Sequence, residues 1–289
     1  MLHQRIRVPT SGGASIQMDV YVPEASQEIH ADVRRPAIVV APGGGHRFCN
    51  LAEAEPVALR FLMEGFNVFV VWYRVYDAGA PLPEGYGTLD WWEASQNHVF
   101  PLPQQDVAAC VAHVRAHAQA WRTDPDRIAV MGFSAGAYLA ACLGGLWHHA
   151  DLWQEMGLSP EQVRPNALAL SYPVTVADHD GLPIVFERMT GQKDPQKHQA
   201  LSVPGWVTEA YPPTFMWHTF TDELVKVQNS IRLSKALTEA GVLNELHVFH
   251  KGRHGLTLCS DLTGTRLKEC EQWPAMAARF LRTAMPAKE

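Results

Sequence analysis

A serine hydroxyl between two glycines is the first feature of this sequence that could do chemistry. The stretch IAVMGFSAGAYLA contains the pattern Gly-x-Ser-x-Gly, with Ser134 between Gly132 and Gly136. An apolar run precedes the pattern and a helix-like run follows it, so a strand is expected to turn sharply into a helix at the serine. A serine at such a turn can attack an acyl group. Because the bare pattern also occurs in ordinary turns, the assignment depends on finding partners for the serine.

A serine nucleophile needs a general base, and His254 is the histidine best placed for that role. It follows the strand-like stretch ELHVFH by a few residues, and Gly252 and Gly255 beside it free the backbone to turn. His247 and His250 lie within or at the end of the same strand. For these two we expect ordinary packed or solvated side chains.

The base in turn needs an acid that orients it, and this acid is expected after the preceding strand. Asp222 directly follows the stretch PTFMWHTFT, and Glu223 is its neighbour. Adjacent residues in a turn point in different directions, so at most one of them belongs to a triad. We favour Asp222, with Glu223 as the fallback, although both could simply be acids at a helix N-terminus. Asp178 and Asp180, after an earlier strand, are a more distant alternative.

Two backbone segments could stabilise the oxyanion that forms when a serine attacks an ester. The N–H of Ala135 lies at the start of the expected helix, where the helix dipole favours negative charge. In the stretch APGGGHRF, Gly44 and Gly45 let the backbone approach a substrate carbonyl closely. The common phosphate-loop patterns do not fit these glycines. We therefore predict an oxyanion hole formed by Gly44, Gly45 and Ala135.

The substrate pocket is predicted to be shaped by two insertions, at residues 76–101 and 175–212. The first carries several aromatic residues, which could stack on sugar rings, line an acyl pocket or pin the loop to the core. The second contains no clear long helix and is expected to form a small, irregular cap. The predicted pocket residues are His46, Trp91, Trp92 and Phe133.

These residues must be positioned by a sheet, and the pattern of the chain predicts one. Apolar strand-like runs alternate with helical patterns, which favours the α/β class and a doubly wound, mainly parallel sheet. Two strand-like pieces around Ser11 to Gly13 are expected to form an antiparallel hairpin at one edge of that sheet. Helices are expected over about 53–65, 225–240 and 273–281. We interpret residues 1–289 as a single domain.

Composition excludes several classes of protein. The formal net charge is −6, and the lysines and arginines are scattered, so we expect no nucleic-acid partner. No apolar run approaches the length of a membrane helix, and the N-terminus has no secretory signal pattern, so a cytoplasmic location is expected. The five cysteines show no metal-binding or disulfide spacing, and buried reduced thiols are expected. We predict neither a metal nor a cofactor.

Taken together, several motifs resemble a known family. The stretches PGGGH, YRV, DPDRIAVMGFSAGAYLA, PPTFMWHTFTDELVKVQNS and ELHVFHKGRHGL are similar to those of the α/β-hydrolase fold, and in particular to bacterial esterases and lipases that include acetylxylan-esterase-like proteins. The resemblance covers the chain from about Arg35 to the C-terminus. It implies Ser134 as nucleophile, Asp222 as acid and His254 as base, with the three glycines and Ala135 as the oxyanion hole.

The chemistry that follows is acyl transfer on a small-molecule ester, with acetylated carbohydrate among the candidate substrates. The triad does not choose the leaving group, so a lactone, thioester, formamide or peptide remains an alternative substrate. The same fold also occurs in receptors without catalytic activity, a less favoured interpretation because all three triad residues are present. The sequence leaves the oligomeric state open.

Overall fold

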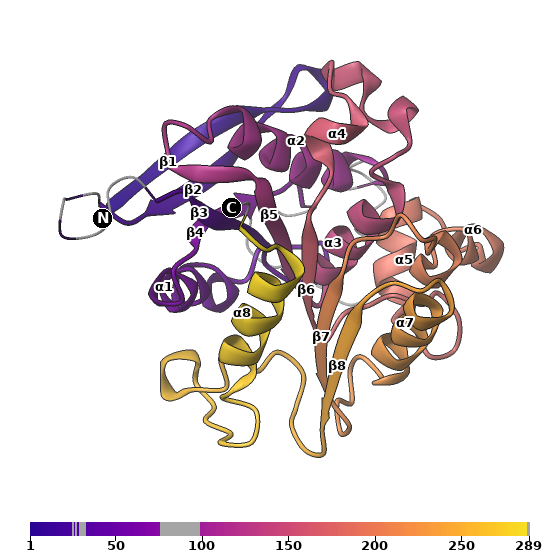
Figure 1. Cartoon of the computed structure of the whole chain (residues 1–289). Helices are drawn as coiled ribbons and strands as arrows, with labels where there is room; N and C mark the ends of the chain where they lie inside the picture. The colour runs from indigo at the N-terminus through magenta and orange to yellow at the C-terminus, as the bar shows by residue number, and fades with distance from the viewer. Residues whose placement is uncertain (25, 27, 29–32, 76–98, 288–289) are drawn as a thin grey trace.

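The centre of the structure is a twisted sheet (Figure 1). The computed structural model describes residues 1–24, 26, 28, 33–75 and 99–287, and these contribute eight strands to the sheet. Their order across the sheet is β1-β2-β4-β3-β5-β6-β7-β8. The strands are β1 (Leu2–Pro9), β2 (Ser15–Val22), β3 (Arg35–Ala41), β4 (Asn67–Trp72), β5 (Thr123–Phe133), β6 (Ala167–Ser171), β7 (Thr214–Thr219) and β8 (Asn244–Phe249).

Strand directions agree with the sequence-based expectation. β1 pairs antiparallel with β2, and β2 pairs antiparallel with β4. Every other neighbouring pair, from β4–β3 to β7–β8, is parallel. The α/β class, the mainly parallel sheet and the antiparallel N-terminal hairpin at its edge are therefore confirmed.

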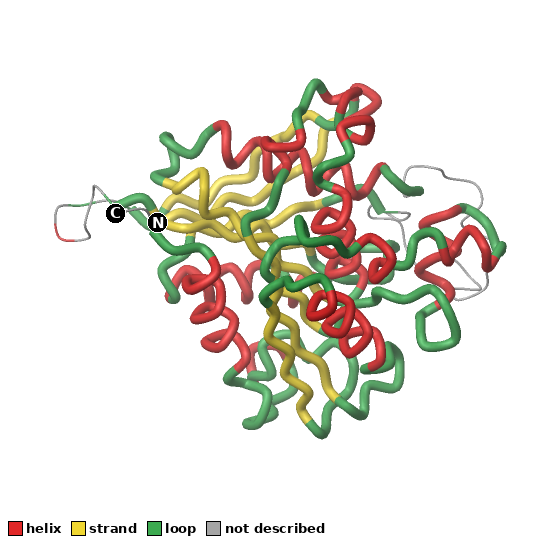
Figure 2. The backbone as a smooth tube through the Cα atoms, turned by 45° about the vertical axis from the view of Figure 1, so that its right-hand side comes forward, coloured by secondary structure: helices red, strands yellow, loops and turns green. Residues whose placement is uncertain are grey.

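Helices cover both faces of the sheet. Figure 1 shows α1 and α8 on one face and α3 and α7 on the other, and Figure 2 shows the strands enclosed between them. In the described part of the chain, every helix falls short of the length and apolar character that crossing a bilayer requires. The helices are α1 (Glu55–Met63), α2 (Leu102–Ala116), α3 (Ala135–Leu146), α4 (Pro160–Val163), α5 (Pro183–Thr190), α6 (Pro195–Gln199), α7 (Gln228–Glu239) and α8 (Trp273–Ala284).

The central strands are apolar on both faces because helices cover both faces. Successive side chains of a strand point to opposite sides, so Val39 and Val130 pack in the core formed with α2 and α3. Their neighbours Val40 and Met131 pack in the second core, formed with α1 and α8. All four side chains are fully buried. Each such burial contributes about 1.5–3 kcal/mol, which fixes the strands that carry the site.

Two helix boundaries differ from the expectation. α1 begins at Glu55, and Glu53 belongs to a separate short turn, η3 (Leu51–Glu53), which the side chain of Asn50 caps. α7 begins at Gln228 rather than near Val225, because the amide of Val225 donates a hydrogen bond to the Asp222 carboxylate.

The segment at 175–212 contains more regular structure than expected. It forms the short helices α5 and α6, each with a proline in its first turn, where the missing N–H costs nothing. Gly191 ends α5 in the left-handed conformation, with φ of 65°. The other predicted insertion, at 76–101, falls mainly on residues 76–98, which lie outside the described residues together with Trp91 and Trp92.

The parallel strands bring distant parts of the chain to one edge of the sheet. β3, β5, β6, β7 and β8 run in the same direction, so the segments that follow them all leave the sheet at its carboxyl edge. Open α/β sheets bind ligands at this edge. The residues singled out by the sequence follow β3, β5, β7 and β8, so the topology gathers them.

Candidate active site

Ser134 occupies a tight turn between β5 and α3. Its φ is 51° and its ψ is −116°, a conformation that L-residues rarely adopt. The flanking glycines make the turn possible: a Cβ on Gly132 would lie 2.4 Å from the carbonyl oxygen of Gly136, and a Cβ on Gly136 would lie 2.1 Å from that of Ala41. The Gly-x-Ser-x-Gly pattern is thus a packing requirement of this turn.

Replacing Gly136 with alanine is expected to destabilise the protein by about 2–3 kcal/mol, since the new methyl group would overlap backbone atoms of β3 that cannot move independently. In a chain of this length the melting temperature should fall by about 5 °C or more. Thermal unfolding followed by circular dichroism measures the effect. Gly205→Ala is the matched control, because a Cβ at Gly205 meets open space. Equal melting temperatures for the two variants would contradict this account of the turn.

The structure brings Ser134, His254 and Asp222 together. Nε2 of His254 lies 2.8 Å from Oγ of Ser134, and Nδ1 lies 2.7 Å from Oδ2 of Asp222. With its proton on Nδ1, the imidazole donates to the carboxylate and accepts from the hydroxyl. The His254 side chain is 16% exposed and that of Asp222 is 1% exposed. The acid is therefore shielded from water, while the imidazole stays partly accessible.

Asp222 is held in its ionised form by its surroundings. Its Oδ1 accepts hydrogen bonds from the amides of Leu224 and Val225, at 3.0 and 2.9 Å. Burial of the carboxyl group raises the pKa of Asp222, but hydrogen bonds with His218 and His254 lower it by more, so the pKa lies below the usual value of an aspartate. Asp222 is therefore ionised at neutral pH and can orient the imidazole of His254 there.

The alternative acids lie elsewhere. The side chain of Glu223 is exposed and is not hydrogen-bonded to His254. Asp178 and Asp180 form a group with His179 whose ligand atoms lie within 4.8 Å of one another, close enough to hold a metal ion. Arg232 reaches Asp178 at 2.7 Å, and Lys226 reaches Asp180 at 3.5 Å.

The glycine loop after β3 lies against the serine. A Cβ on Gly43 would be 3.1 Å from that of Ser134. The amide of Gly43 donates to Oε2 of Glu53 at 2.7 Å, so it is already engaged. The amides of Gly44 and Gly45 have no acceptor among the described residues. Ala135 is the first residue of α3, where amides have no partner within the helix.

A hollow of about 400 Å³ opens beside Ser134 and mixes apolar and polar walls. Two predicted pocket residues, His46 and Phe133, are not among the described residues that line it. His46 is fully buried, with its ring against Tyr73 and Tyr138, and Phe133 is fully buried beside Tyr172 and Trp273. The lining residues are Gly44, Gly45, Phe48, Asn50, Glu53, Ser134, Leu182, Ile184, Arg188, Leu224, His254 and Gly255.

Sequence reasoning missed several residues at the site. Leu182, Ile184 and Arg188 reach it from α5 and the turn before it, and Arg188 also donates to the carbonyl oxygen of Gly45. His218 lies inside β7, where Nε2 is 3.3 Å from Oδ2 of Asp222. Its position four residues before Asp222 could have indicated that the two side chains meet. The helix expected over about 53–65 would place Glu53 in its first turn, and nothing in the neighbouring sequence indicates that Glu53 is buried.

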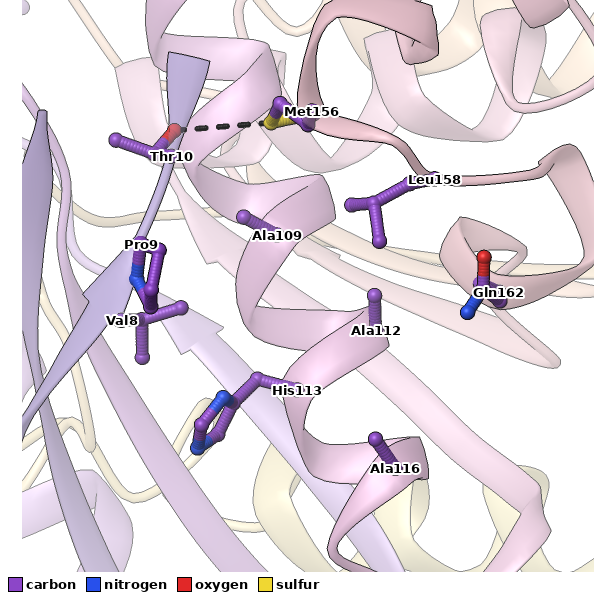
Figure 3. A pocket seen from close by; sticks show the side chains of 10 residues that line it. All are labelled: Val8, Pro9, Thr10, Ala109, Ala112, His113, Ala116, Met156, Leu158 and Gln162. Carbon is purple, nitrogen blue, oxygen red and sulfur yellow. Dashed lines mark hydrogen bonds between the residues drawn. The ribbon is translucent and has the colours of Figure 1, made fainter. Parts of the chain in front are cut away.

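A second hollow, of about 250 Å³, lies between the end of β1 and α2 (Figure 3). Its walls are mainly small or apolar, with the ring of His113 on one side and the Thr10 hydroxyl 3.8 Å from Sδ of Met156 on another. Burial lowers the pKa of His113 to about 4, and the neighbouring His117 acts in the same direction. The second hollow shares no residue with the hollow beside Ser134 and is not part of the site.

Comparison with known proteins gives a consistent family. The BD-FAE family model matches residues 83–237. Over 268 residues, or 90% of this chain, the sequence is 30% identical to "Endo-1,4-beta-xylanase B" of Butyrivibrio fibrisolvens. It is also 30% identical, over 260 residues and 88% of the chain, to "Acetylxylan esterase" of Xylanibacter ruminicola. The chain spans only 39% and 46% of these two curated relatives.

A solved structure extends the match. The acetyl ester-xyloside bifunctional hydrolase from Caldicellulosiruptor lactoaceticus is 30% identical, with a TM-score of 0.75 over 93% of this chain and 88% of the other. Strand order, the turn at Ser134 and these relatives agree with the resemblance that the motifs indicated. The chain belongs to the BD-FAE family and has the α/β-hydrolase fold.

Proposed function

We propose that the chain is a serine carboxylesterase that removes small acyl groups, acetyl above all, from hydroxyl groups of a carbohydrate. The observation that carries the proposal is the continuous hydrogen-bond chain from Ser134 Oγ through His254 to Asp222, with distances of 2.8 and 2.7 Å. This is the geometry in which an imidazole can take a proton from a serine. The hollow beside Ser134 leaves room for an ester at the same point.

Acylation begins when Nε2 of His254 accepts the Ser134 proton while Oγ attacks the ester carbonyl carbon. The carbonyl oxygen gains a negative charge, and the amides of Ala135 and of Gly44 or Gly45 donate hydrogen bonds to it. One such donor is worth about 3–4 kcal/mol. Asp222 stabilises the imidazolium and keeps its second nitrogen directed at the reaction.

Collapse of the tetrahedral intermediate completes the first half of the reaction. The bond to the alcohol oxygen breaks, and His254 returns its proton to that oxygen, so the free hydroxyl leaves. A water molecule then gives a proton to His254 and attacks the acyl-serine by the same path. Release of the carboxylic acid restores the Ser134 hydroxyl.

The substrate class is supported by the relatives and by the hollow. Two of the relatives are named for acetyl esters, and all three names refer to xylan or a xyloside. The hollow presents Leu182 and Ile184 on its apolar side, which suits an acyl methyl group. Asn50 also lines the hollow, and its side-chain amide can donate a hydrogen bond to a sugar hydroxyl.

A substrate panel tests the proposal. Acetate, butyrate and octanoate esters of p-nitrophenol are compared by kcat/KM, and acetate release from an acetylated xylo-oligosaccharide is measured beside them. We expect acetate to be favoured over octanoate by about tenfold or more, and acetate to be released from the sugar. p-Nitrophenyl β-xyloside serves as the control for glycoside cleavage, and we expect it to remain intact.

Preference for the octanoate ester, or no release from the sugar, would reject the carbohydrate substrate. If a lactone, thioester or formamide is hydrolysed faster than every p-nitrophenyl ester, the proposed substrate class changes to that compound. Failure of the folded protein to react with a fluorophosphonate probe would instead support a receptor without catalytic activity.

A further inference from the structure

Glu53 is a buried carboxyl group at the centre of the site that the proposed mechanism does not use. Its exposed fraction is 2%, yet it lines the hollow beside Ser134. The short turn η3 places it there: Asn50 caps this turn by accepting from the amide of Ala52 at 3.1 Å. Buried acids are rare unless their oxygens are satisfied, so the partners of Glu53 indicate why it is there.

One oxygen of Glu53 holds the glycine loop. Oε2 accepts the amide of Gly43 at 2.7 Å, and the carbonyl oxygen of Gly43 accepts the amide of Asn50 at 2.9 Å. Both the N–H and the carbonyl group of Gly43 are therefore held by hydrogen bonds. Gly44 follows with φ of 129°, and a Cβ there would lie 2.0 Å from the carbonyl oxygen of Phe48. The direction of the next amides thus depends on where Gly43 is held.

The other oxygen of Glu53 holds the segment that carries the histidine. Oε1 accepts the Tyr172 hydroxyl at 2.7 Å, and the hydroxyl oxygen accepts the amide of Thr257 at 3.2 Å. Thr257 lies three residues after His254, and its carbonyl oxygen accepts the Trp273 indole N–H at 2.7 Å. The Tyr172 ring also meets the His254 ring edge-on, with centroids 4.9 Å apart. Glu53 therefore connects the loops after β3, β6 and β8.

We propose that Glu53 is a positioning residue that sets the oxyanion amides and the catalytic histidine in register by bridging Gly43 and Tyr172. The inference rests on the proposed serine esterase function. Its chemical basis is that both oxygens accept hydrogen bonds from donors fixed by separate strands, so one rigid group determines the distance between the two halves of the site. An oxyanion donor is effective only when it is aimed correctly before the reaction starts.

An ionised carboxylate suits this role better than a neutral one. Two acceptors are needed, and a carboxylic acid would present an O–H to a site that already contains two donors. Burial raises the pKa of Glu53, while the hydrogen bonds from Tyr172 and from the amide of Gly43, together with the nearby His254, oppose that rise. On balance the pKa of Glu53 stays above its usual value, so its two hydrogen bonds, rather than its charge alone, define its role.

The test compares Glu53→Ala, Glu53→Gln and Tyr172→Phe by steady-state kinetics on p-nitrophenyl acetate and by the affinity of phenylboronic acid. The boronate forms a tetrahedral adduct on a serine and so reports on the oxyanion amides directly. We expect Glu53→Ala to lower kcat by about 10- to 100-fold, to change KM by less than about threefold, and to weaken boronate binding by the same factor as kcat. Glu53→Gln keeps an acceptor for Gly43 and should restore most of kcat.

Tyr172→Phe keeps the ring on His254 and removes only the hydroxyl, so a loss of about 3- to 10-fold in kcat is expected, corresponding to the loss of one partner. It also keeps the inference testable if Glu53→Ala does not fold. Asp19→Ala is the matched control, because Asp19 is a buried carboxylate on β2 that accepts from Arg5 and Trp72 and does not line the hollow beside Ser134. It should lower the melting temperature without changing kcat.

Parental kcat and boronate affinity in folded Glu53→Ala, or in both Glu53→Gln and Tyr172→Phe, would overturn the inference. So would a loss of kcat in Glu53→Ala that Asp19→Ala reproduces at a similar drop in melting temperature. A parent protein that hydrolyses no ester would refute the proposed function instead, and the boronate measurement would still decide whether Glu53 aligns the amides beside Ser134.

Discussion

Ser134→Ala is expected to lower kcat for p-nitrophenyl acetate by about 10⁴-fold or more and to leave the protein folded. The loss corresponds to about 5.5 kcal/mol of transition-state stabilisation. It arises because alanine has no atom that can form the acyl bond. Residual turnover should come from the amides of Ala135 and the glycine loop, which can still polarise a bound ester toward attack by water. Steady-state assays at a high concentration of purified variant measure the effect.

A serine far from the site separates this effect from general perturbation. Ser234 lies on α7, and its hydroxyl donates to the Asn244 side chain at 2.6 Å at the opposite edge of the sheet. Ser234→Ala removes the same atom and should keep parental kcat. Near-parental turnover in folded Ser134→Ala would remove the serine from the mechanism, and the acyl-enzyme with it.

Asp222→Asn is expected to lower kcat by about 10⁴-fold, because of where the amide must point. The amides of Leu224 and Val225 both donate to Oδ1, so the oxygen of an asparagine would take that position. Its NH₂ group would then face Nδ1 of His254. The imidazole would be driven to carry its proton on Nε2, where it could no longer accept one from Ser134.

The neighbouring acid provides the control. Glu223 is exposed and shares the same turn, so Glu223→Gln should retain kcat within about twofold. Kinetics at several pH values should show the Asp222→Asn defect throughout, since the lowered pKa of Asp222 keeps the parent carboxylate ionised. A larger loss of kcat in Glu223→Gln than in Asp222→Asn would show that Glu223, and not Asp222, is the acid that orients His254.

The three residues of the hydrogen-bond chain could be predicted because their signals are local. Each follows an apolar run that is recognisably a strand, and parallel strands end at a common edge. Order along the chain then sufficed to select Asp222 and His254 from many acids and histidines. The glycines were informative for the same reason, since the turn at Ser134 demands them wherever the rest of the chain lies.

The walls of the site could not be predicted because they depend on tertiary contacts. His46 adjoins the glycine loop in sequence, but its φ of 58° turns the side chain inward against Tyr73 and Tyr138. Glu53 is the converse case, a residue that sequence reasoning did not assign to the site. In sequence it resembles an acid at a helix N-terminus, and its hydrogen bonds with Gly43 and Tyr172 exist only in the folded protein. Neither outcome is encoded by neighbours in sequence.

The segment between β6 and β7 contributes to the substrate pocket without carrying any of the residues Ser134, Asp222 and His254. Residues 172–213 add no strand to the sheet, yet through Leu182, Ile184 and Arg188 they supply much of the wall facing Ser134. Leu182 and Ile184 are partly exposed and lie away from the strands, so substitutions at these two positions would change this wall while leaving the strand register and the Ser134 turn in place. Under the proposed esterase function, evolution could therefore change the preferred ester through side chains of this segment while Ser134, His254 and Asp222 keep their positions.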